Sequence, residues 1–483
     1  MPNLAFAIVL IPFAGAACVA LLPAAWAKWI AQLFALATFA AALMLAYLFG
    51  ASGAAPVAVD VVTVGQAAVL GIIVDKISVL IIVAVVGVGL LVCIYSAAYL
   101  NLGNREHPDP GRPKYYAWLL AFIGSMAGLV FSSTLVGQLL FFEMTGMCSW
   151  ALIGYYEDRN SLKAAAKAML ITHIGSLGLY VAAAVLFAAA GTFALSAIGD
   201  LDRTTKTIVL LAILFAAWGK SAQLPLQMWL PDAMVAPTPI SAYLHAAAMV
   251  KVGVYIFARS LFAAGAVPEV VGWVGAVMAV ATMVYGFFLY LPQKDLKRLL
   301  AYSTITQLSY IFFALSVSVF GSRLAFDGAI AHIFNHAFAK SLFFFVAGAL
   351  AYTTGTRMLP DLRGIMTRAP LVGIAFCAAA MAVAGVPPFN AFFSKFAIFA
   401  GGFEAARQHP LLLPLVIVAL LESVGSFAWF LHWVGICVFG KPSPQVAAAA
   451  PVPVPMQAVL LILIIMTLCS GEIAASWLAG GAP

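Results

Sequence analysis

Fourteen long apolar runs dominate the sequence and leave few folds open to it. Each run is long enough to cross the hydrocarbon core of a bilayer as a helix, which takes about 20 residues. Only 8% of the residues are charged, against about 25% in soluble domains. We therefore predict an all-α polytopic membrane protein with transmembrane helices near residues 2–22, 28–50, 75–99, 115–132, 134–155, 164–190, 207–236, 240–263, 269–291, 296–318, 326–352, 370–402, 410–438 and 456–478.

Two of these runs, 207–236 and 370–402, are broken by prolines, in QLPLQMWLPDAM and AGVPPFNAFFSKF. Proline exposes backbone polar groups that lipid cannot satisfy, so each break must lie inside protein or line a wet cavity. Counted from the fourth run, five runs are followed by five more, and the broken run is the fourth of each set. This pattern predicts two inverted five-helix repeats with a transport site between them at mid-membrane.

The expected organisation has four parts. Residues 1–113 hold three spans and a hairpin-like loop at 51–74, residues 114–265 and 266–440 are the two repeats, and residues 441–483 carry the last span. The N-terminus lacks a basic segment and a clear cleavage site, so we expect the first span to be retained.

Lysine and arginine predict the orientation. With the N-terminus outside, fourteen basic residues fall on or beside inner loops and five on outer loops, so the positive-inside rule puts both termini outside the cytoplasm of the cell (inner) membrane. The net charge of +7 follows from this bias and does not indicate nucleic-acid binding. Lys76 adjoins Asp75 at a span edge, and we expect it to pair there or to reach the interface.

Four lysines remain inside predicted spans, where a charge costs at least about 2.5–3.5 kcal/mol and by default marks an ion pathway. Lys220 has an acidic counterpart in Glu143, at similar depth in the same repeat. The pair is either a static helix clamp or a modulated pair in which Lys220 can release its proton once the carboxylate moves away. We favour the modulated pair.

Further titratable residues extend this pathway. His332, His336 and Lys340 stand at i, i+4 and i+8 and share one helical face. Two histidines with neither an HExxH glutamate nor a third ligand favour a titratable stripe over a metal site. Lys251 is expected to be a relay, whereas His245 is either a relay or a hydrogen-bonded core residue. Lys395 follows the second break, as Lys220 precedes the first.

Other polar residues receive structural interpretations. His173 is expected to make a core hydrogen bond, and Asp295, Lys297 and Arg298 to anchor a span edge. The six cysteines are scattered, and nucleotide-binding and haem motifs are absent from the sequence. No cofactor or metal is therefore expected in this chain, and whether it is part of an enzyme is left open.

The segments GKSAQLPLQMWLPDAMVAPTPISAYLHAAAMVKVGVY, DLKRLLAYSTITQLSY, HIFNHAFAKSLFF and VPPFNAFFSKF resemble the proton-conducting membrane subunit family. That family comprises the antiporter-like subunits of NADH:quinone oxidoreductase, Mrp-type antiporters and membrane-bound hydrogenases. The resemblance covers roughly residues 70–435. NREHPDPGRPKYYAWLLAFIGSMAGLV and VGQLLFFEMTGMCSWALIGYYE look most similar to the D-type membrane subunit of hydrogenase-4.

The resemblance implies a mid-membrane polar axis. In it Glu143 and Lys220 are the input pair, Lys251, His332 and His336 the central relay, and Lys395 the exit-side base. Where some relatives have an Arg and an Asp in the sixth span, this chain has His173 and Ser176, which leaves a second ion pair there in doubt.

Three functions remain open. The first is a proton-translocating subunit of a hydrogenase-type redox complex, whose nickel–iron and iron–sulfur centres lie in partner subunits. The second is an Mrp-type sodium/proton antiporter subunit, or an antiporter-like subunit of NADH:quinone oxidoreductase. The third is a membrane scaffold whose charges only hold helices together.

Overall fold

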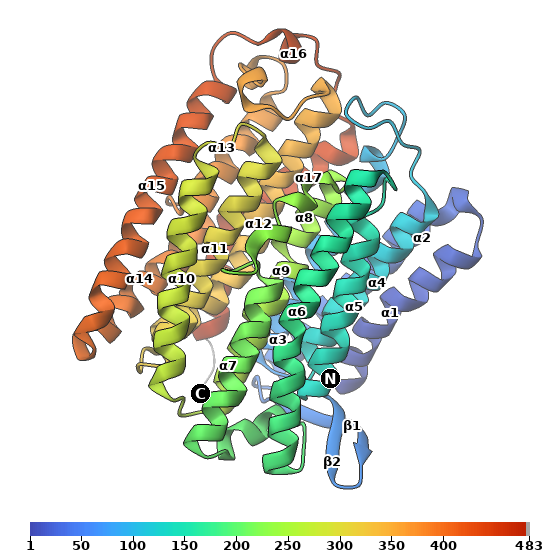
Figure 1. Cartoon of the computed structure of the whole chain (residues 1–483). Helices are drawn as coiled ribbons and strands as arrows, with labels where there is room; N and C mark the ends of the chain where they lie inside the picture. Colours follow the sequence, from blue (N-terminus) through green and yellow to red (C-terminus); the bar gives the residue numbers. More distant parts are fainter. Residues whose placement is uncertain (480–483) are drawn as a thin grey trace.

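Helices dominate the computed structural model, which describes residues 1–479 (Figure 1). The first half contains α1 (Pro2–Leu21), α2 (Ala27–Ala51), strands β1 (Val57–Val64) and β2 (Ala67–Val74), α3 (Lys76–Tyr99), α4 (Pro113–Phe131), α5 (Leu135–Ile153), α6 (Arg159–Ala190), α7 (Arg203–Lys220), α8 (Thr238–Ala246) and α9 (Met249–Ala264).

The second half contains α10 (Glu269–Tyr290), α11 (Leu296–Ser318), α12 (Arg323–Thr354), α13 (Pro370–Ala384), α14 (Asn390–Gln408), α15 (Leu413–Val438), α16 (Pro444–Ala447) and α17 (Val454–Ala479). Short 3-10 turns join the helices: η1 (Ala24–Trp26), η2 (Leu195–Asp200), η3 (Gln227–Trp229), η4 (Asp232–Val235), η5 (Leu359–Asp361), η6 (Ile365–Thr367) and η7 (Pro410–Leu412).

The all-α polytopic class is confirmed. Within residues 1–479, twelve helical stretches are long and apolar enough to cross a membrane, and they match twelve of the fourteen predicted runs. The other two runs are the proline-broken ones, which fold as α7 followed by irregular chain and as the pair α13 and α14. The count of fourteen and the inverted repeats stay predictions.

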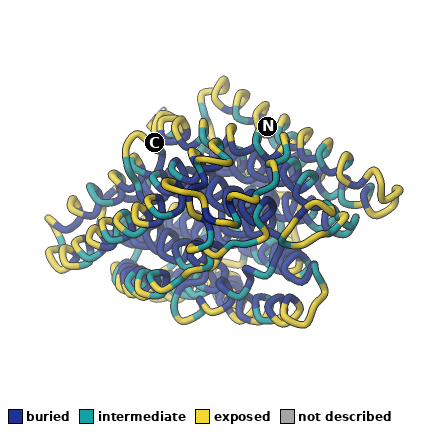
Figure 2. The backbone as a smooth tube through the Cα atoms, turned by 90° about the horizontal axis from the view of Figure 1, so that it is seen from above, coloured by how far each residue is buried: buried dark blue, intermediate teal, exposed yellow. Residues whose placement is uncertain are grey.

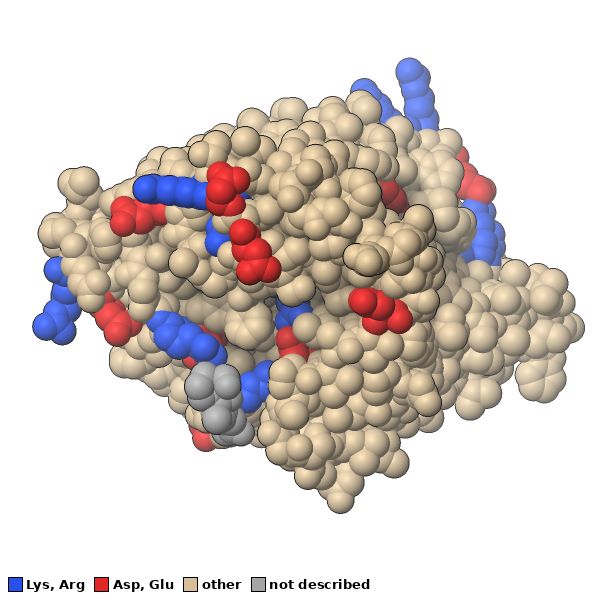
Figure 3. Space-filling model, turned by 90° about the horizontal axis from the view of Figure 1, so that it is seen from below, with Lys and Arg blue, Asp and Glu red and all other residues tan. Residues whose placement is uncertain are grey.

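The loops gather at two opposite ends of the bundle. The basic end comprises residues 99–113, 154–159, 290–296, 354–370 and 439–454, and it is held together by bonds such as Arg105 N to Tyr352 O and Ala450 N to Thr353 O. The hairpin end carries β1, β2 and the described ends of the chain, where Ser52 contacts Met1 and Lys76 donates to Leu478 O. Charged side chains of both signs are scattered over that face (Figure 3). The grouping of loops agrees with the positive-inside count, and the membrane side of each end stays a prediction.

The predicted hairpin at 51–74 forms an antiparallel pair, β1 with β2, in register from Val57 opposite Val74. Asp75 then caps α3 by accepting from Ser78 N at 2.9 Å. The carboxylate of Asp75 pairs with buried Arg259 at the end of α9. Lys76 Nζ donates to Leu478 O at 3.0 Å, and its expected pairing at the span edge or reach to the interface stays a prediction.

Buried backbone fills the middle of the molecule and exposed backbone lies toward its edges (Figure 2). Helix α12 is buried along nearly all of its length. It packs against α3, α8, α11, α13, α14 and α17. Gly328 allows this packing, because a Cβ there would press on Ala397 and the backbone of Ile398 in α14. The polar side chains of α12 are expensive in lipid, so a central helix enclosed by protein is the place where they are tolerated.

Most of the first proline break, residues 221–237, is buried in the protein, whereas Pro225 and Met228 are exposed and residues near Asp232 line a cavity. Neighbouring helices supply hydrogen-bond partners for several of its polar groups. Leu224 N donates to the Thr282 hydroxyl at 3.3 Å, and the Trp229 indole donates to Gly219 O at 3.1 Å. The second break, 385–389, turns at Gly385, whose φ of +84° suits glycine.

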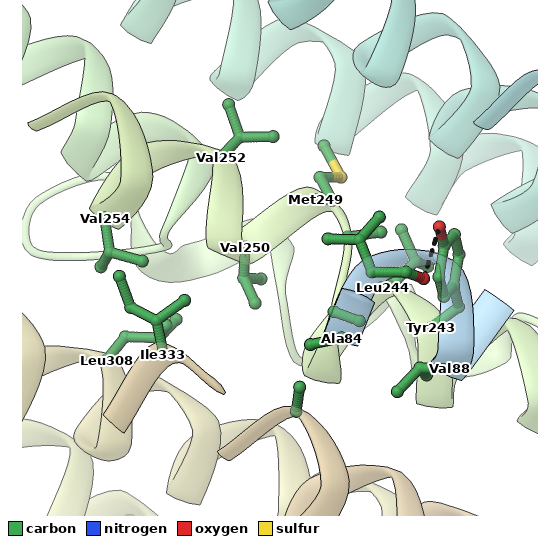
Figure 4. Packing of buried hydrophobic residues seen from close by; sticks show 14 of the residues in the cluster. Ala84, Val88, Tyr243, Leu244, Met249, Val250, Val252, Val254, Leu308 and Ile333 are labelled. Carbon is green, nitrogen blue, oxygen red and sulfur yellow. Dashed lines mark hydrogen bonds between the residues drawn. The ribbon is translucent and has the colours of Figure 1, made fainter. Parts of the chain in front are cut away.

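A further interruption, at Ala247 and Ala248, separates α8 from α9 within the predicted span 240–263. Ser221 Oγ donates to Val250 O at 2.7 Å just beyond it. Apolar side chains including Leu244, Met249 and Val250 surround the interruption (Figure 4). The kinked segment is therefore closed off from lipid.

At the basic end, the loop between α5 and α6 is clamped by charge. Glu157 accepts from Lys114 and, at 2.8 Å, from Arg112. These cations, Lys114 first, hold the pKa of Glu157 below its usual range. The Arg112 guanidinium also lies over the Tyr155 ring at 4.6 Å, which fixes the start of α4 against this loop.

Candidate ion-translocation axis

Lys220 is the last residue of α7 and is fully enclosed. Its Nζ lies 4.5 Å from the ring centre of Phe142, in cation–π contact, and beside Gly146 of α5. The carbonyls at the end of a helix favour a cation at this place. The C-terminal end of α7 therefore favours the charged form of Lys220.

Glu143 lies one turn from Gly146 on the same helix, yet within the described chain no ion pair joins it to Lys220. Its carboxylate instead meets His173 Nδ1 at 3.2 Å. His173 is 51% exposed and Glu143 26% exposed, so the expected core role of His173 is wrong. The pairing of Glu143 with Lys220 stays a prediction. In the sixth span, where the resemblance led us to look for a second ion pair, His173 binds Glu143.

Gln223 connects the first break to α11. Its amide donates to Ile305 O at 3.3 Å and its oxygen accepts from Ser309 Oγ at 2.7 Å. The sequence interpretation did not single out this glutamine. An amide in an apolar run, two residues before Pro225, was the available signal, because such a group must find partners in the protein.

Lys251 and His245 lie on either side of the α8–α9 interruption, and both are buried. Neither Lys251 Nζ nor either ring nitrogen of His245 has a protein hydrogen-bond partner among the described residues. The His245 ring packs 4.8 Å from the Phe344 ring. Because a buried unpaired polar group costs about 1–3 kcal/mol, these positions are poor places for purely structural residues.

The predicted stripe on α12 is confirmed as one buried face of one continuous helix. His332 contacts Ser394 Oγ at 2.9 Å and Gln307 Oε1 at 3.2 Å. The His332 and His336 rings lie 6.0 Å apart, centre to centre.

At the far end of the stripe, Lys340 donates to Ser303 Oγ. Lys251 lies within electrostatic reach of His332, His336 and Lys340. The stripe thus joins α9 on one side to α14, through Ser394, on the other.

Lys395 on α14 closes the line. Its Nζ lies 3.3 Å from the carbonyl of Ala384, the last residue of α13, and 3.2 Å from Ser423 Oγ. The Tyr310 ring lies 4.6 Å away, and the hydroxyl of Tyr310 donates to buried Glu422. Glu422 thus becomes the acidic neighbour of Lys395, a role that the sequence interpretation left unassigned although an acid inside an apolar run pointed to it.

No group of three or more His, Cys, Asp or Glu side chains placed to hold a metal ion occurs in the described chain. The arrangement that does occur is a series of buried basic groups, of which His332, Lys340 and Lys395 contact a neutral hydroxyl or amide. Such groups can pass protons or sense each other's charge, and they contain no redox chemistry.

The sequence from 132 to 421, more than half of the chain, matches the family model described as NADH:quinone oxidoreductase/Mrp antiporter, TM. The chain belongs to this family. Residues 62–116 match a second model, described as the N-terminus of complex I chain 5. The resemblance noted in the sequence is thereby confirmed at family level.

Two similar members of the NADH:quinone oxidoreductase/Mrp antiporter family come from bacteria. A probable K⁺/H⁺ antiporter A/B subunit of Rhizobium meliloti is 36% identical over 364 residues, with 74% of this chain and 35% of that protein covered. An NAD(P)H-quinone oxidoreductase chain 5 of Picosynechococcus is 37% identical over 359 residues, with 70% and 52% covered. The chain therefore spans only about a third to a half of these relatives.

Solved structures of this kind share the fold. A chain of the Mrp complex from Dietzia has a TM-score of 0.85 and 29% identity, with 100% of this chain and 52% of that chain covered. A chain of the archaeal membrane-bound sulfane sulfur reductase also has a TM-score of 0.85, at 24% identity, with 99% and 96% covered. At that identity the second likeness shows the fold alone.

Proposed function

We propose that this chain translocates protons across the membrane along the buried axis. The observation that carries the proposal is the series of enclosed basic side chains on the central helix α12 and beside the helix interruptions, which an inert helix bundle would not retain. The relay residues are Glu143, Lys220, His245, Lys251, His332, His336, Lys340 and Lys395.

Glu143 is the proposed switch at one end of the axis. In the conformation described, its carboxylate binds His173, while the Lys220 ammonium contacts the Phe142 ring and lies within electrostatic reach of Glu143 without forming a direct ion pair. Burial then favours the neutral amine, so the lysine gives its proton toward Lys251. When the carboxylate turns to Lys220, opposite charge favours the ammonium and the lysine is reloaded. Because the groups are coupled, they titrate as a unit.

The outward face of this switch supports a place in a larger assembly. Glu143 and His173 are partly exposed at the depth where lipid would surround an isolated chain. Polar groups at that depth face protein or water, since lipid offers them no partners. We propose that another membrane subunit covers the surface of α5 and α6 around this pair.

For the assembly we propose a hydrogenase-type redox complex, whose nickel–iron and iron–sulfur centres belong to partner subunits. Its support is the likeness of the α4 and α5 segments to the D-type membrane subunit of hydrogenase-4. An Mrp-type sodium/proton antiporter or a complex I-like enzyme is the second candidate, supported by the antiporter and chain 5 relatives. Co-purified subunits distinguish them: hydrogenase or dehydrogenase subunits in one case, small antiporter subunits and sodium-dependent exchange in the other.

Lys220→Ala tests the proton pathway. In the intact complex, reconstituted in vesicles, we expect proton flux to fall at least about tenfold because the axis loses its first exchangeable group, while the subunits still assemble. Unchanged flux with normal assembly contradicts the proposal.

The scaffold alternative has its own test. The double variant Glu143→Gln/Lys220→Met removes both charges and keeps similar side-chain volumes. A scaffold tolerates that change with ion flux intact, whereas the proposed relay loses flux in this variant as well.

A further inference from the structure

A cavity of about 390 Å³ opens at the basic end, between the start of α6 and the η4 turn of the first break. Lys167 and Asp232 form an ion pair at 2.7 Å on its wall. Val235, Arg298 and Arg357 line the side nearest α11. This basic-end cavity reaches the first break through Pro231, Asp232 and Val235, and the proposed relay does not yet include it.

Lys297 lies directly behind this wall. It follows Leu296 at the start of α11, is only 2% exposed, and donates from Nζ to Ala236 O at 2.7 Å. Its chain neighbour Arg298 and the neighbour of Ala236, Val235, both line the cavity. A lysine that anchors a helix in the membrane interface keeps its ammonium in water. The expected anchoring role of Lys297 is therefore wrong.

The position is also unfavourable for a merely structural cation. Burial costs several kcal/mol for an ion, and the start of a helix carries partial positive charge. The one hydrogen bond that Lys297 donates, to Ala236 O, could be made by a neutral donor without the cost of burying a charge. Glu106 and Asp295 lie within electrostatic reach of the ammonium and Arg357 opposes them, so the charge of the buried ammonium is only partly compensated.

On its inner side Lys297 approaches the axis. His245 lies within electrostatic reach of both Lys340 and Lys297. Both ring nitrogens of His245 lack protein partners among the described residues, so either nitrogen is free to accept a proton. Lys297 thus stands between the cavity wall and the first buried imidazole.

A polar network fixes this passage. Arg357 Nε donates to Asp295 at 2.6 Å and its terminal nitrogen to Glu106 at 3.3 Å. The Tyr99 hydroxyl donates to Glu106 at 3.1 Å and meets the Thr238 hydroxyl at 3.2 Å. The network runs from the cap of α11 to the first residue of α8. It therefore holds the two helices that carry Lys297 and His245 in register.

We propose that Lys297 is the entrance of the axis at the basic end, where protons pass between the cavity and His245. In one step an N–H bond of the Lys297 ammonium breaks and an N–H bond forms on a ring nitrogen of His245. The neutral amine then takes a proton from solvent in the cavity. This inference rests on the proposed proton translocation.

Substitutions at Lys297 in the intact complex test the step. Lys297→Met removes the exchangeable proton. Lys297→Arg keeps the charge and a donor for Ala236 O but does not deprotonate in proteins. We expect both variants to lose at least about tenfold in proton flux in vesicles. The matched control Lys294→Met, at an exposed lysine three residues earlier, is expected to change flux less than twofold.

The outcomes separate three explanations. If Lys297→Arg keeps normal flux, the lysine is only an anchor and the entrance is overturned. If Lys340→Met abolishes flux while both Lys297 variants conduct normally, the axis stands and the entrance fails. If Lys340→Met also conducts normally, the proposed function itself fails.

A second measurement does not depend on how the Lys297 variants fold. Val235→Cys places a thiol on the cavity wall beside Ala236. A membrane-impermeant thiol reagent added at the basic end is expected to block most of the flux in this variant and to leave the natural chain, with its own six cysteines, unaffected. Complete labelling with unchanged flux overturns the proposal.

Discussion

Single residues in the axis differ in how far the sequence predicted them. A titratable side chain in a long apolar run must either be buried in protein or reach the membrane interface. The enclosed positions that we expected for this reason are those of Lys220, Lys251, His336 and Lys340. Lys297 begins a helix beside Arg298, a pattern that equally describes an exposed anchor. Its burial depends on the backbone of Ala236, 61 residues away in sequence, which no local pattern reveals.

The Asp75–Arg259 pair is another residue-scale feature beyond sequence reasoning, since its members are 184 residues apart. Arg259→Met leaves a buried carboxylate without its counter-charge, and we expect a loss of about 3–5 kcal/mol in stability. Thermal unfolding of the purified protein measures this loss. The double variant Asp75→Asn/Arg259→Met, which keeps a cap on α3, is expected to recover most of it. Equal unfolding temperatures for natural and single-variant proteins would contradict the role of the pair.

At the scale of elements, proline predicted two breaks and missed the third. The sequence LHAAAMVKV between α8 and α9 consists largely of good helix formers, and the interruption at Ala247 and Ala248 arises from packing. Ser221 in the first break donates a hydrogen bond to Val250 O just after the interruption. The first break therefore helps to fix the kink between α8 and α9. Propensity alone could not place this kink, so the placement of His245 and Lys251 on two separate helices could not be predicted.

The contact between α7 and α9 has a testable requirement at Gly253. A Cβ at this position would meet Ala217 O and Ser221 Oγ of the α7 end. Gly253→Ala is therefore expected to push α9 away and to cost about 1–3 kcal/mol through overpacking. Gly435→Ala on α15, where a Cβ meets nothing within 4 Å, is the control and is expected to be neutral. Unfolding in detergent compares the two, and equal effects would refute the close approach.

At the scale of the whole molecule, the sequence predicted the grouping of loops into two ends because charge bias is summed over many residues. The sequence could not predict which outer surface carries exposed polar groups, because that depends on how α5 and α6 bring Glu143 and His173 together. Their exposure on α5 and α6 places the expected partner contact on this face.

Cross-linking tests this contact. Leu177 is 52% exposed on α6, one turn beyond His173, and a cysteine there leaves the polar pair intact. In native membranes Leu177→Cys is expected to give a cross-linked product with a second membrane subunit when a short bifunctional reagent is added. The isolated purified chain serves as control. Absence of the product in native membranes, with the subunits assembled, would show that the face meets lipid.

The burial of α12 has a consequence for how the protein is made. This helix of 32 residues is enclosed on all sides in the finished fold, yet it leaves the ribosome before α13, α14 and α17 exist. On the translocon insertion scale a central lysine opposes entry into lipid by about 2.5–3.5 kcal/mol, and two histidines accompany Lys340. We therefore expect the nascent helix to stay beside the insertion machinery until later helices arrive. On this expectation the second half of the chain inserts cooperatively and not one helix at a time.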